Sequence, residues 1–390
     1  MDAVRSAILG AVLLVVGLLS VAAGLLPVTD AVGVGARVWP ILLFVVAITV
    51  VTELAAEAGL FALLAERTAS WGRGRGWLLW LLVLALSVVS TMFLSLDTTA
   101  VLLTPVVVLL ARHVGLSPLP FALTTVWIAN TASLLLPVSN LTNLLAAHEL
   151  AGMTPLEFAA LMAAPAVVSI AIPAGLLFVF YRKELLRRYE PAQPSIADDR
   201  VLLVASGTTV VILVPLLVSG LPVWMPALAA AIVLGGFFAV RRAAVLRFSL
   251  VPWQLLLLAA GLFLTVEAAH SLGLGAVLSA VSGKGTGLRD LLQLSTSGAV
   301  GSNLVNNLPA YLALEPVAGN PLRIAALLIG VNAGSLITPW ASLATLLWHE
   351  RLKALDVAVS WRRYVILGLI AAPLTVAAAT LALALVPPLG

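Results

Sequence analysis

The stretch Asn130-Thr-Ala-Ser-Leu-Leu-Leu-Pro137-Val-Ser-Asn-Leu-Thr-Asn-Leu144 decides the fold of this chain, because its pattern occurs twice. The second copy reads Asn332-Ala-Gly-Ser-Leu-Ile-Thr-Pro339-Trp-Ala-Ser-Leu-Ala-Thr-Leu346, and both fit Asn-x-x-Ser-Leu-x-x-Pro-x-x-x-Leu-x-x-Leu. Each copy lies inside a long apolar segment, where a proline removes a helical hydrogen bond and frees backbone polar groups. We therefore predict two helices that are interrupted at matching places in two halves of the chain.

The composition indicates the solvent in which the chain folds. Of its 390 residues, 62% are hydrophobic and only 10% are charged, whereas soluble domains carry roughly 25% charged residues. Apolar runs of membrane-spanning length recur along the sequence, and they are continuous rather than alternating. We therefore predict an all-α polytopic membrane protein, surrounded by a lipid bilayer.

Composition and motifs also exclude several classes of function. The net charge of +4 comes from Arg and Lys residues in short loops, where they set topology, so we predict no nucleic-acid partner. Cysteine is absent and the four histidines are scattered, so we predict no metal site and no other cofactor. The sequence contains neither a catalytic triad nor a phosphate-binding loop, so we expect a protein that is not an enzyme.

The apolar runs predict the membrane topology. We predict nine spans, at residues 7–26, 38–65, 119–147, 155–181, 200–219, 221–240, 252–281, 321–349 and 360–388. Two further segments, 77–111 and 286–318, have Asp or Asn at their centres, so we interpret each as a re-entrant hairpin. With this arrangement five clusters of Arg and Lys fall on one side, which the positive-inside rule assigns to the cytoplasm. The protein is then expected in the cell (inner or plasma) membrane. Its N-terminus is expected in the cytoplasm and its C-terminus on the outside.

Further matches indicate an internal repeat. Glu53 and the pair Gly59-Leu60 recur in the same order as Glu267 and Gly273-Leu274. The polar centres of the two hairpins also fall at corresponding places. Because the charge pattern gives the two copies opposite orientations, we predict inverted repeats.

The repeat divides the chain into three parts. Residues 1–188 form the first repeat, 189–200 form a cytoplasmic linker, and 201–390 contain a linking span and the second inverted repeat. Each repeat contains one hairpin and one broken helix. Paired broken segments in inverted repeats are typical of secondary transporters, whose substrate sites lie at the breaks.

Asp97 is the strongest candidate for a coupling residue. It lies at the predicted tip of the first hairpin beside Thr98 and Thr99. An ionisable side chain at this depth is costly unless it faces water, an ion or a partner, so Asp97 could exchange a proton or hold a cation. The alternative is a helix N-cap that accepts hydrogen bonds from the amides of Thr99 and Ala100.

Uncharged polar side chains occupy the other candidate positions. At the tip of the second hairpin, Asn306 and Asn307 can both donate and accept hydrogen bonds, although they could also cap or join helices. The two breaks contribute Asn130, Ser133, Ser139, Asn140, Asn143, Asn332, Ser335, Thr338 and Ser342. Half-helix N-termini and freed carbonyls at such breaks suit a small polar solute or an ion. For any single Ser or Thr, packing between helices is the simpler explanation.

Glu53 and its counterpart Glu267 are candidates for proton coupling. A carboxylate inside an apolar span can belong to a proton pathway. It can equally belong to a structural site satisfied by neighbouring hydroxyls, and the sequence leaves both alternatives open.

Several motifs together resemble the arsenite efflux pumps of the ion transporter superfamily. They are Leu96-Asp-Thr-Thr-Ala-Val-Leu-Leu-Thr-Pro105, Ile128-Ala-Asn-Thr-Ala-Ser-Leu134, Val138-Ser-Asn-Leu-Thr-Asn143, Asn306-Asn-x-Pro309 and Ile337-Thr-Pro-x-x-Ser-Leu-Ala-Thr-Leu-Leu-Trp348. The resemblance implies a two-repeat carrier with an elevator-like movement of its hairpins and broken spans. It also implies export of As(OH)3 or Sb(OH)3 against a proton, a soluble ATPase subunit that can pair with the carrier, and a homodimer by analogy.

The chain departs from this family at several positions. In members of the family we expect Asn at the position where this chain has Leu96, and Asp where this chain has Asn130 and Asn332. We also expect a basic residue near the position of Leu336. Because the core has fewer charges than expected for this family, a sodium/proton antiporter of the same fold is the alternative function. A sodium-coupled anion carrier ranks lowest, because its Ser-Asn-Thr tips and Gly-Thr-Pro breaks are missing.

Overall fold

The computed structural model describes residues 3–150, 152–190 and 199–386. Within these ranges the regular structure is helical, apart from an isolated bridge between Arg75 and Arg188. Eight of the described helices are long and apolar enough to cross a membrane. The prediction of an all-α polytopic membrane protein is therefore confirmed.

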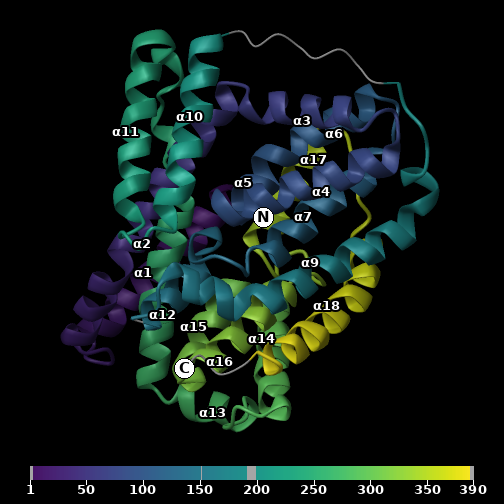
Figure 1. Cartoon of the computed structure of the whole chain (residues 1–390). Helices are drawn as coiled ribbons and strands as arrows, with labels where there is room; N and C mark the ends of the chain where they lie inside the picture. Colours follow the sequence, from purple (N-terminus) through teal and green to yellow (C-terminus); the bar gives the residue numbers. More distant parts are fainter. Residues whose placement is uncertain (1–2, 151, 191–198, 387–390) are drawn as a thin grey trace.

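One side of the molecule consists of five helices, which we call the outer group (Figure 1). They are α1 (Ala3–Ala22), α2 (Val28–Glu57), α10 (Arg200–Leu217), α11 (Trp224–Arg241) and α12 (Trp253–Ser271). The 3-10 turns η3 (Ala243–Val245) and η4 (Phe248–Leu250) connect the last two. Much of this group faces outward, as the exposure of Val211 (71%) and Ile232 (66%) shows. Such apolar exposure is expected of helices that face lipid.

Close packing joins α1 to α12 in the outer group. A Cβ atom added at Gly10 would lie 2.5 Å from the backbone nitrogen of Leu258, and one at Gly261 would lie 2.6 Å from the carbonyl oxygen of Gly10. Glycine at these two positions lets the backbones approach closely, as is common between membrane helices.

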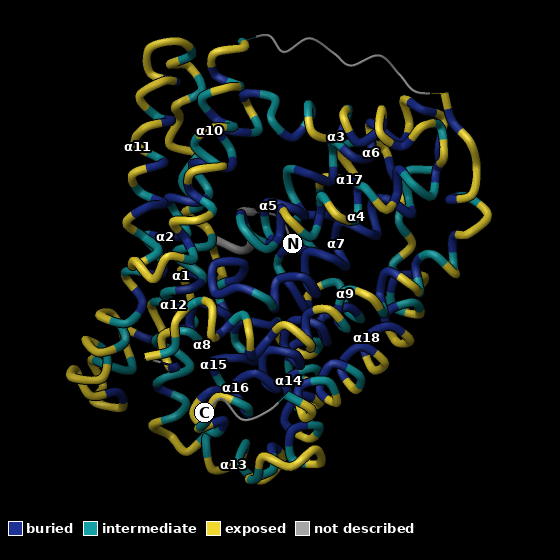
Figure 2. The backbone as a smooth tube through the Cα atoms, in the orientation of Figure 1, coloured by how far each residue is buried: buried dark blue, intermediate teal, exposed yellow. Residues whose placement is uncertain are grey.

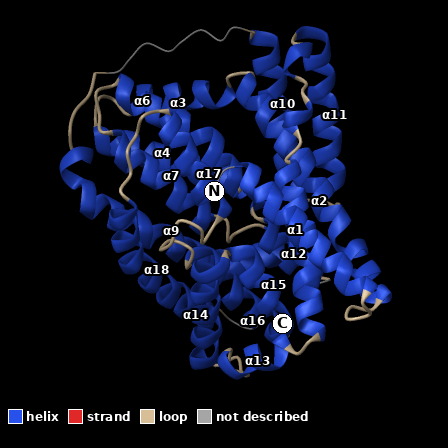
Figure 3. Cartoon of the chain, turned by 180° about the vertical axis from the view of Figure 1, so that it is seen from behind, coloured by secondary structure: helices blue, strands red, loops and turns tan. Residues whose placement is uncertain are grey.

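The other side of the molecule, which we call the core group, contains the hairpins and the broken helices. In the first half of the chain its elements are α4 (Gly76–Phe93), α5 (Leu96–Thr98), the π-helix η1 (Thr99–Leu103), α6 (Thr104–His113), α7 (Pro118–Ala132), η2 (Pro137–Ser139), α8 (Leu141–Glu149) and α9 (Pro155–Leu185). In the second half they are α14 (Leu288–Val305), α15 (Asn307–Ala318), α16 (Pro321–Leu328), the π-helix η5 (Ile329–Ala333), α17 (Leu343–Ala354) and α18 (Trp361–Ala384). Figure 3 shows the same division into two groups from behind.

The broken helices lie at the centre of the core group. Every residue from Pro120 to Ala132 in α7 is buried, and so is every residue from Arg323 to Ala333 in α16 and η5. Figure 2 shows this buried centre between outer faces that are exposed. Irregular backbone at membrane depth is tolerated only where protein buries it or where it lines a cavity, so this placement is the expected one.

Two of the predicted spans are shorter than expected. The span predicted over 38–65 ends with α2 at Glu57, and the span predicted over 252–281 ends with α12 at Ser271. Gly59 and Gly273 follow with φ angles of 85° and 98°, a left-handed conformation that ends a helix and that glycine adopts at little cost. The short helices α3 (Leu60–Trp71) and α13 (Leu274–Val281) begin there in a new direction.

The predicted division into repeats stays a prediction. The order of a glycine-broken helix, a hairpin, a broken helix and a long helix occurs once in each half of the described chain. Most of the predicted linker, residues 191–198, lies outside the described residues. At its end Asp199 caps α10 and pairs with Arg241 at 2.9 Å.

Candidate functional site

Both hairpins turn at a residue with an unusual backbone conformation. Ser95 has φ 146° and ψ 164°, and Asn306 has φ 126° and ψ 157°. This region is essentially restricted to glycine, and other residues in it cost of order 1–3 kcal/mol and cluster at functional sites. Each side chain caps the helix that follows, since Ser95 Oγ accepts from the Thr98 amide at 3.2 Å and Asn306 Oδ1 accepts from the Leu308 amide at 3.3 Å.

The tip of the second hairpin holds the second break in place. Asn306 Nδ2 donates to the Trp340 carbonyl at 2.8 Å, and the Asn307 amide donates to the Ala341 carbonyl at 2.8 Å. One turn earlier, Asn303 Oδ1 accepts from the Thr338 amide at 2.9 Å, and Asn303 Nδ2 donates to the Gly334 carbonyl at 2.8 Å. Asn303 was not among the predicted site residues, although its place in the polar run before Asn306 is a usable signal.

The first break is held by its own side chains. Asn143 Nδ2 donates to the carbonyls of Ser133 (2.7 Å) and Leu136 (3.1 Å). Ser139 Oγ lies within hydrogen-bond distance of the same two carbonyls and can donate its one hydrogen to either. These contacts satisfy backbone groups that the interruption at Pro137 leaves free, so much of the polarity at this break is structural.

Asn332 connects the two breaks. Its Oδ1 accepts from Asn140 Nδ2 at 2.7 Å and from Thr142 Oγ1 at 3.2 Å. Its Nδ2 lies 3.2 Å from Asn143 Oδ1 and 3.1 Å from Thr142 Oγ1. Side chains predicted from two distant copies of one motif therefore meet in a buried network.

Ser335 connects the breaks less tightly, whereas Ser342 does not connect them. Ser335 Oγ lies 3.4 Å from Asn130 Oδ1 and donates to the Asn332 carbonyl at 2.8 Å. Ser342 is buried, and its Oγ has no hydrogen-bond partner among the described residues. A buried hydroxyl without a partner is rare, so Ser342 has hydrogen-bonding capacity for a water or a solute.

The first hairpin tip carries one free carboxylate. Asp97 forms no hydrogen bond or ion pair with any residue in the described ranges, and it lines a cavity of about 230 Å³ with Glu53, Thr98 and Arg351. The alternative that Asp97 caps the helix is wrong, because Ser95 performs that role. Thr99 is buried and donates to Ser90 Oγ at 3.0 Å, so its side chain holds the hairpin together.

A smaller cavity of about 50 Å³ joins Asp97 to the first break. Ser139 and Asn140 line it from the break, and Thr49 and Leu255 line it from α2 and α12. Thr49 and Leu255 also line the larger cavity. The free carboxylate therefore lies between the outer group and the polar first break, next to the network of Asn332.

The structure separates the two predicted coupling glutamates. Glu53 shares the cavity of Asp97, whereas Glu267 lines a different cavity of about 760 Å³ with Arg37 and Glu315. There Arg37 pairs with Glu315 at 2.5 Å and with Glu149 at 3.3 Å.

This ion-pair cluster joins the outer group to the core group. Arg37 belongs to α2, whereas Glu315 and Glu149 belong to α15 and α8. Tyr311 also donates to Glu315 at 2.8 Å. The sequence analysis did not predict this cluster. Glu315, which precedes Pro316 in an otherwise apolar helix, could have indicated it.

A helical membrane fold in which two interrupted helices bring polar breaks together defines the class of secondary transporters. The family model described as "Citrate transporter" matches residues 3–345, and the chain belongs to this family of membrane transporters. The arsenical pump membrane protein of Escherichia coli strain K12 is 32% identical over 85% of this chain and 83% of its own length. That of Yersinia enterocolitica is 31% identical over 90% and 87%. The predicted resemblance to the arsenical pump family is thus confirmed.

A solved structure supports the fold independently. The YdaH transporter of Alcanivorax borkumensis matches with a TM-score of 0.61 at 15% identity, over 91% of this chain and 87% of that one. At this identity the likeness concerns the architecture alone. It agrees with the polytopic helical fold described above.

Proposed function

We propose that this protein exports arsenite and antimonite in exchange for protons. The observation that carries the proposal is the Asp97 carboxylate, which has no partner among the described residues and lines a small cavity with Ser139 and Asn140. As(OH)3 and Sb(OH)3 are small neutral trihydroxides that both donate and accept hydrogen bonds. Hydroxyl and amide side chains match them, and no thiolate is required. The relatives named as arsenical pumps support the same substrate class.

Competition at Asp97 accounts for the exchange. The ionised carboxylate accepts hydrogen bonds from the hydroxyls of the bound trihydroxide. Protonation removes the charged acceptor and thereby weakens binding of the solute. The neutral side chain then returns through the membrane at lower cost. Solute and proton thus occupy the carrier in turn, which is the condition for antiport. Glu53 in the same cavity is a second site that can hold the proton.

The position of the cavity supports loading from the cytoplasm. Its lining includes Arg351, which the charge pattern assigns to the cytoplasmic side. Its walls come from α2 and α12 of the outer group and from the hairpin tip and α17 of the core group. An elevator-type movement of the core group along the outer group would carry this site across the membrane. A soluble ATPase subunit and a homodimer are further proposals that rest on the resemblance.

Uptake into everted, respiring vesicles tests the proposal. We expect radiolabelled arsenite to accumulate, and a protonophore to abolish the accumulation. Vesicles that take up no arsenite but release protons on addition of sodium or lithium would contradict it. That result would favour the sodium/proton antiporter, for which two carboxylates in one cavity, Asp97 and Glu53, are a suitable cation site.

A further inference from the structure

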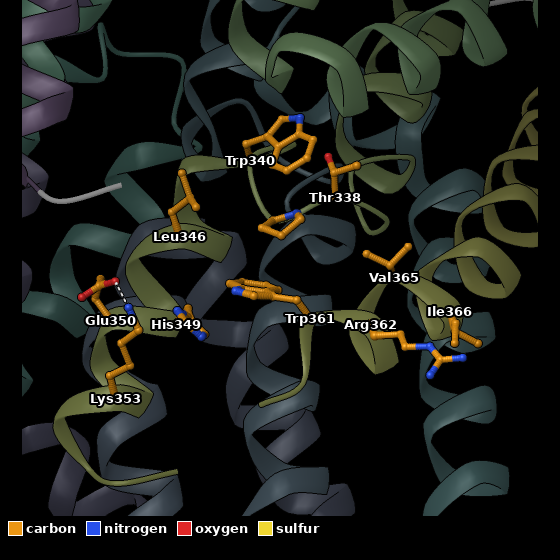
Figure 4. Close-up of a pocket in the computed structure, with 11 residues that line it drawn as sticks. Thr338, Trp340, Leu346, His349, Glu350, Lys353, Trp361, Arg362, Val365 and Ile366 are labelled. Atoms are coloured by element: carbon orange, nitrogen blue, oxygen red, sulfur yellow. Dashed lines mark hydrogen bonds and ion pairs between the residues drawn. The ribbon is translucent and has the colours of Figure 1, made fainter. Parts of the chain in front are cut away.

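A groove lies on the surface of the core group, between the second break, α17 and α18. It has a volume of about 740 Å³ (Figure 4). The break contributes Thr338, Pro339 and Trp340, and the helices contribute Leu346, His349, Glu350, Lys353, Trp361, Arg362, Val365 and Ile366. The groove is separate from the cavity that contains Asp97.

The walls of this groove are largely apolar and face outward. Trp340 is 51% exposed and Ile366 is 49% exposed. The same face of α18 continues with the exposed side chains of Leu369, Ile370 and Leu374. In a polytopic membrane protein such a continuous apolar face contacts lipid, so the groove opens toward the bilayer.

Arg362 gives the groove a net positive charge, because Glu350 offsets the charge of Lys353. Figure 4 shows both basic side chains away from Trp340, Lys353 on α17 and Arg362 on α18, with His349 and Trp361 between them. Lys353 pairs with Glu350 at 3.0 Å, whereas Arg362 is exposed and forms no hydrogen bond or ion pair with a described residue. Trp361 packs beside His349, with 4.3 Å between ring centroids, at the start of α18. Tryptophan next to basic residues at a helix start is typical of the membrane interface.

We propose that this groove binds an anionic phospholipid. The phosphate would lie at Arg362, and an acyl chain would follow the apolar side chains of Ile366, Val365 and Leu346 toward Trp340. Basic pockets between membrane helices on the cytoplasmic side bind anionic head groups, and a volume in this range holds a head group with part of a chain. The charge at one end and the apolar walls beyond it match this amphipathic ligand.

Lipid in the groove would stabilise the second break. Trp340 lines the groove and also donates through Nε1 to the Asn303 carbonyl at 2.9 Å. Its own carbonyl accepts from Asn306 Nδ2 at 2.8 Å. The lipid tail would therefore contact the residue that ties the break to the tip of the second hairpin.

Native mass spectrometry and thermal unfolding of the purified full chain test the proposal, with dioleoylphosphatidylglycerol and dioleoylphosphatidylcholine as probes. We expect the anionic lipid to bind more tightly and to raise the melting temperature further. Arg362→Gln should reduce the preference for the anionic lipid about fivefold, which corresponds to about 1 kcal/mol for one basic residue near the surface. Ile366→Trp, which fills the apolar wall, should weaken both lipids.

Arg182→Gln is the matched control, because Arg182 is exposed on the same predicted side but outside the groove. It should leave the preference unchanged. Equal binding of the two lipids by the wild type would overturn the proposal. An equal loss of lipid preference in Arg182→Gln would also overturn it, because it would indicate an effect of general surface charge. Cross-linked dimers in which a second copy of the chain covers the groove would overturn it as well.

Discussion

At the scale of single residues, Asp97 differs from the polar side chains around it. Asn332, Asn140 and Asn143 satisfy one another or the backbone, whereas the Asp97 carboxylate faces a cavity and has no partner in the described part of the chain. The amides thus build the site, and the carboxylate is left to interact with solute and proton. The two kinds of residue should respond differently to substitution.

Asp97→Asn tests the coupling role. The amide keeps the size of the side chain and an acceptor oxygen but cannot exchange a proton. We expect accumulation of arsenite in everted vesicles to fall to the level of vesicles without the protein. Asp199→Asn changes a carboxylate that caps α10 and pairs with Arg241, and it should retain accumulation. Equal activity of both variants would count against Asp97.

Asn332→Ala tests the structural role of the amide network. The substitution leaves buried polar groups of Asn140, Thr142 and Asn143 without a partner. Each unsatisfied buried group costs about 1–3 kcal/mol, so unfolding in detergent should occur at a clearly lower temperature. Thr131→Ala is the control, because that hydroxyl donates to the Trp127 carbonyl of its own helix, α7, and its loss should cost less.

At the scale of elements, the hairpin tips are the most demanding parts of the backbone. Ser95 and Asn306 adopt matching conformations that residues with a Cβ atom rarely tolerate. Both residues cap the helix that follows, which compensates part of the strain. The tips therefore combine unfavourable backbone geometry with contacts to the two breaks.

Glycine and valine at the hairpin tips should differ in stability. Ser95→Gly and Asn306→Gly lose the cap but relieve the backbone, whereas Ser95→Val and Asn306→Val lose the cap and keep a branched Cβ. We expect each valine variant to be about 1–3 kcal/mol less stable than its glycine counterpart in thermal or denaturant unfolding. Equal stability of a glycine and valine pair would show that the tip is not strained.

The sequence predicted the elements unevenly, for physical reasons. The breaks at Pro137 and Pro339 were predictable, because proline in an apolar run cannot complete the helix. The ends of α2 and α12 were not, since a single glycine such as Gly59 or Gly273 is often tolerated inside a helix. Only the left-handed conformation, a tertiary outcome, turns that glycine into a helix end.

The same limit applies to the site residues. The motif copies placed Asn140 and Asn332 among the candidates, and the structure brings them into contact. Motif matching also paired Glu53 with Glu267, but they line different cavities. Partners in an inverted repeat are expected at opposite ends of the molecule. The pairing of Arg37 with Glu315 depends on packing between distant segments, which periodicity cannot indicate.

At the scale of the whole molecule, the outer group and the core group meet at two polar places. One is the cavity that contains Asp97, and the other is the ion-pair cluster of Arg37, Glu149 and Glu315. If the core group moves along the outer group during transport, the ion pairs must break and re-form in each cycle.

A cross-link between the groups should stop transport. The chain has no cysteine, so Arg37→Cys combined with Glu149→Cys gives a unique pair on α2 and α8. Treatment with a short, reducible bismaleimide should abolish arsenite transport, and reduction should restore it. Each single variant, treated in the same way, should keep its activity. Full transport by the cross-linked pair would exclude the elevator-type movement.

The coupling of arsenite to protons through Asp97 is the central claim, and proteoliposomes that contain a pH-sensitive dye test it most directly. With a downhill gradient of arsenite and no other ion gradient, the account predicts that wild-type protein moves protons in the opposite direction. Asp97→Asn should still let arsenite move downhill but should move no protons. Arsenite flux without proton movement in the wild type, or unchanged proton movement in Asp97→Asn, would contradict the account.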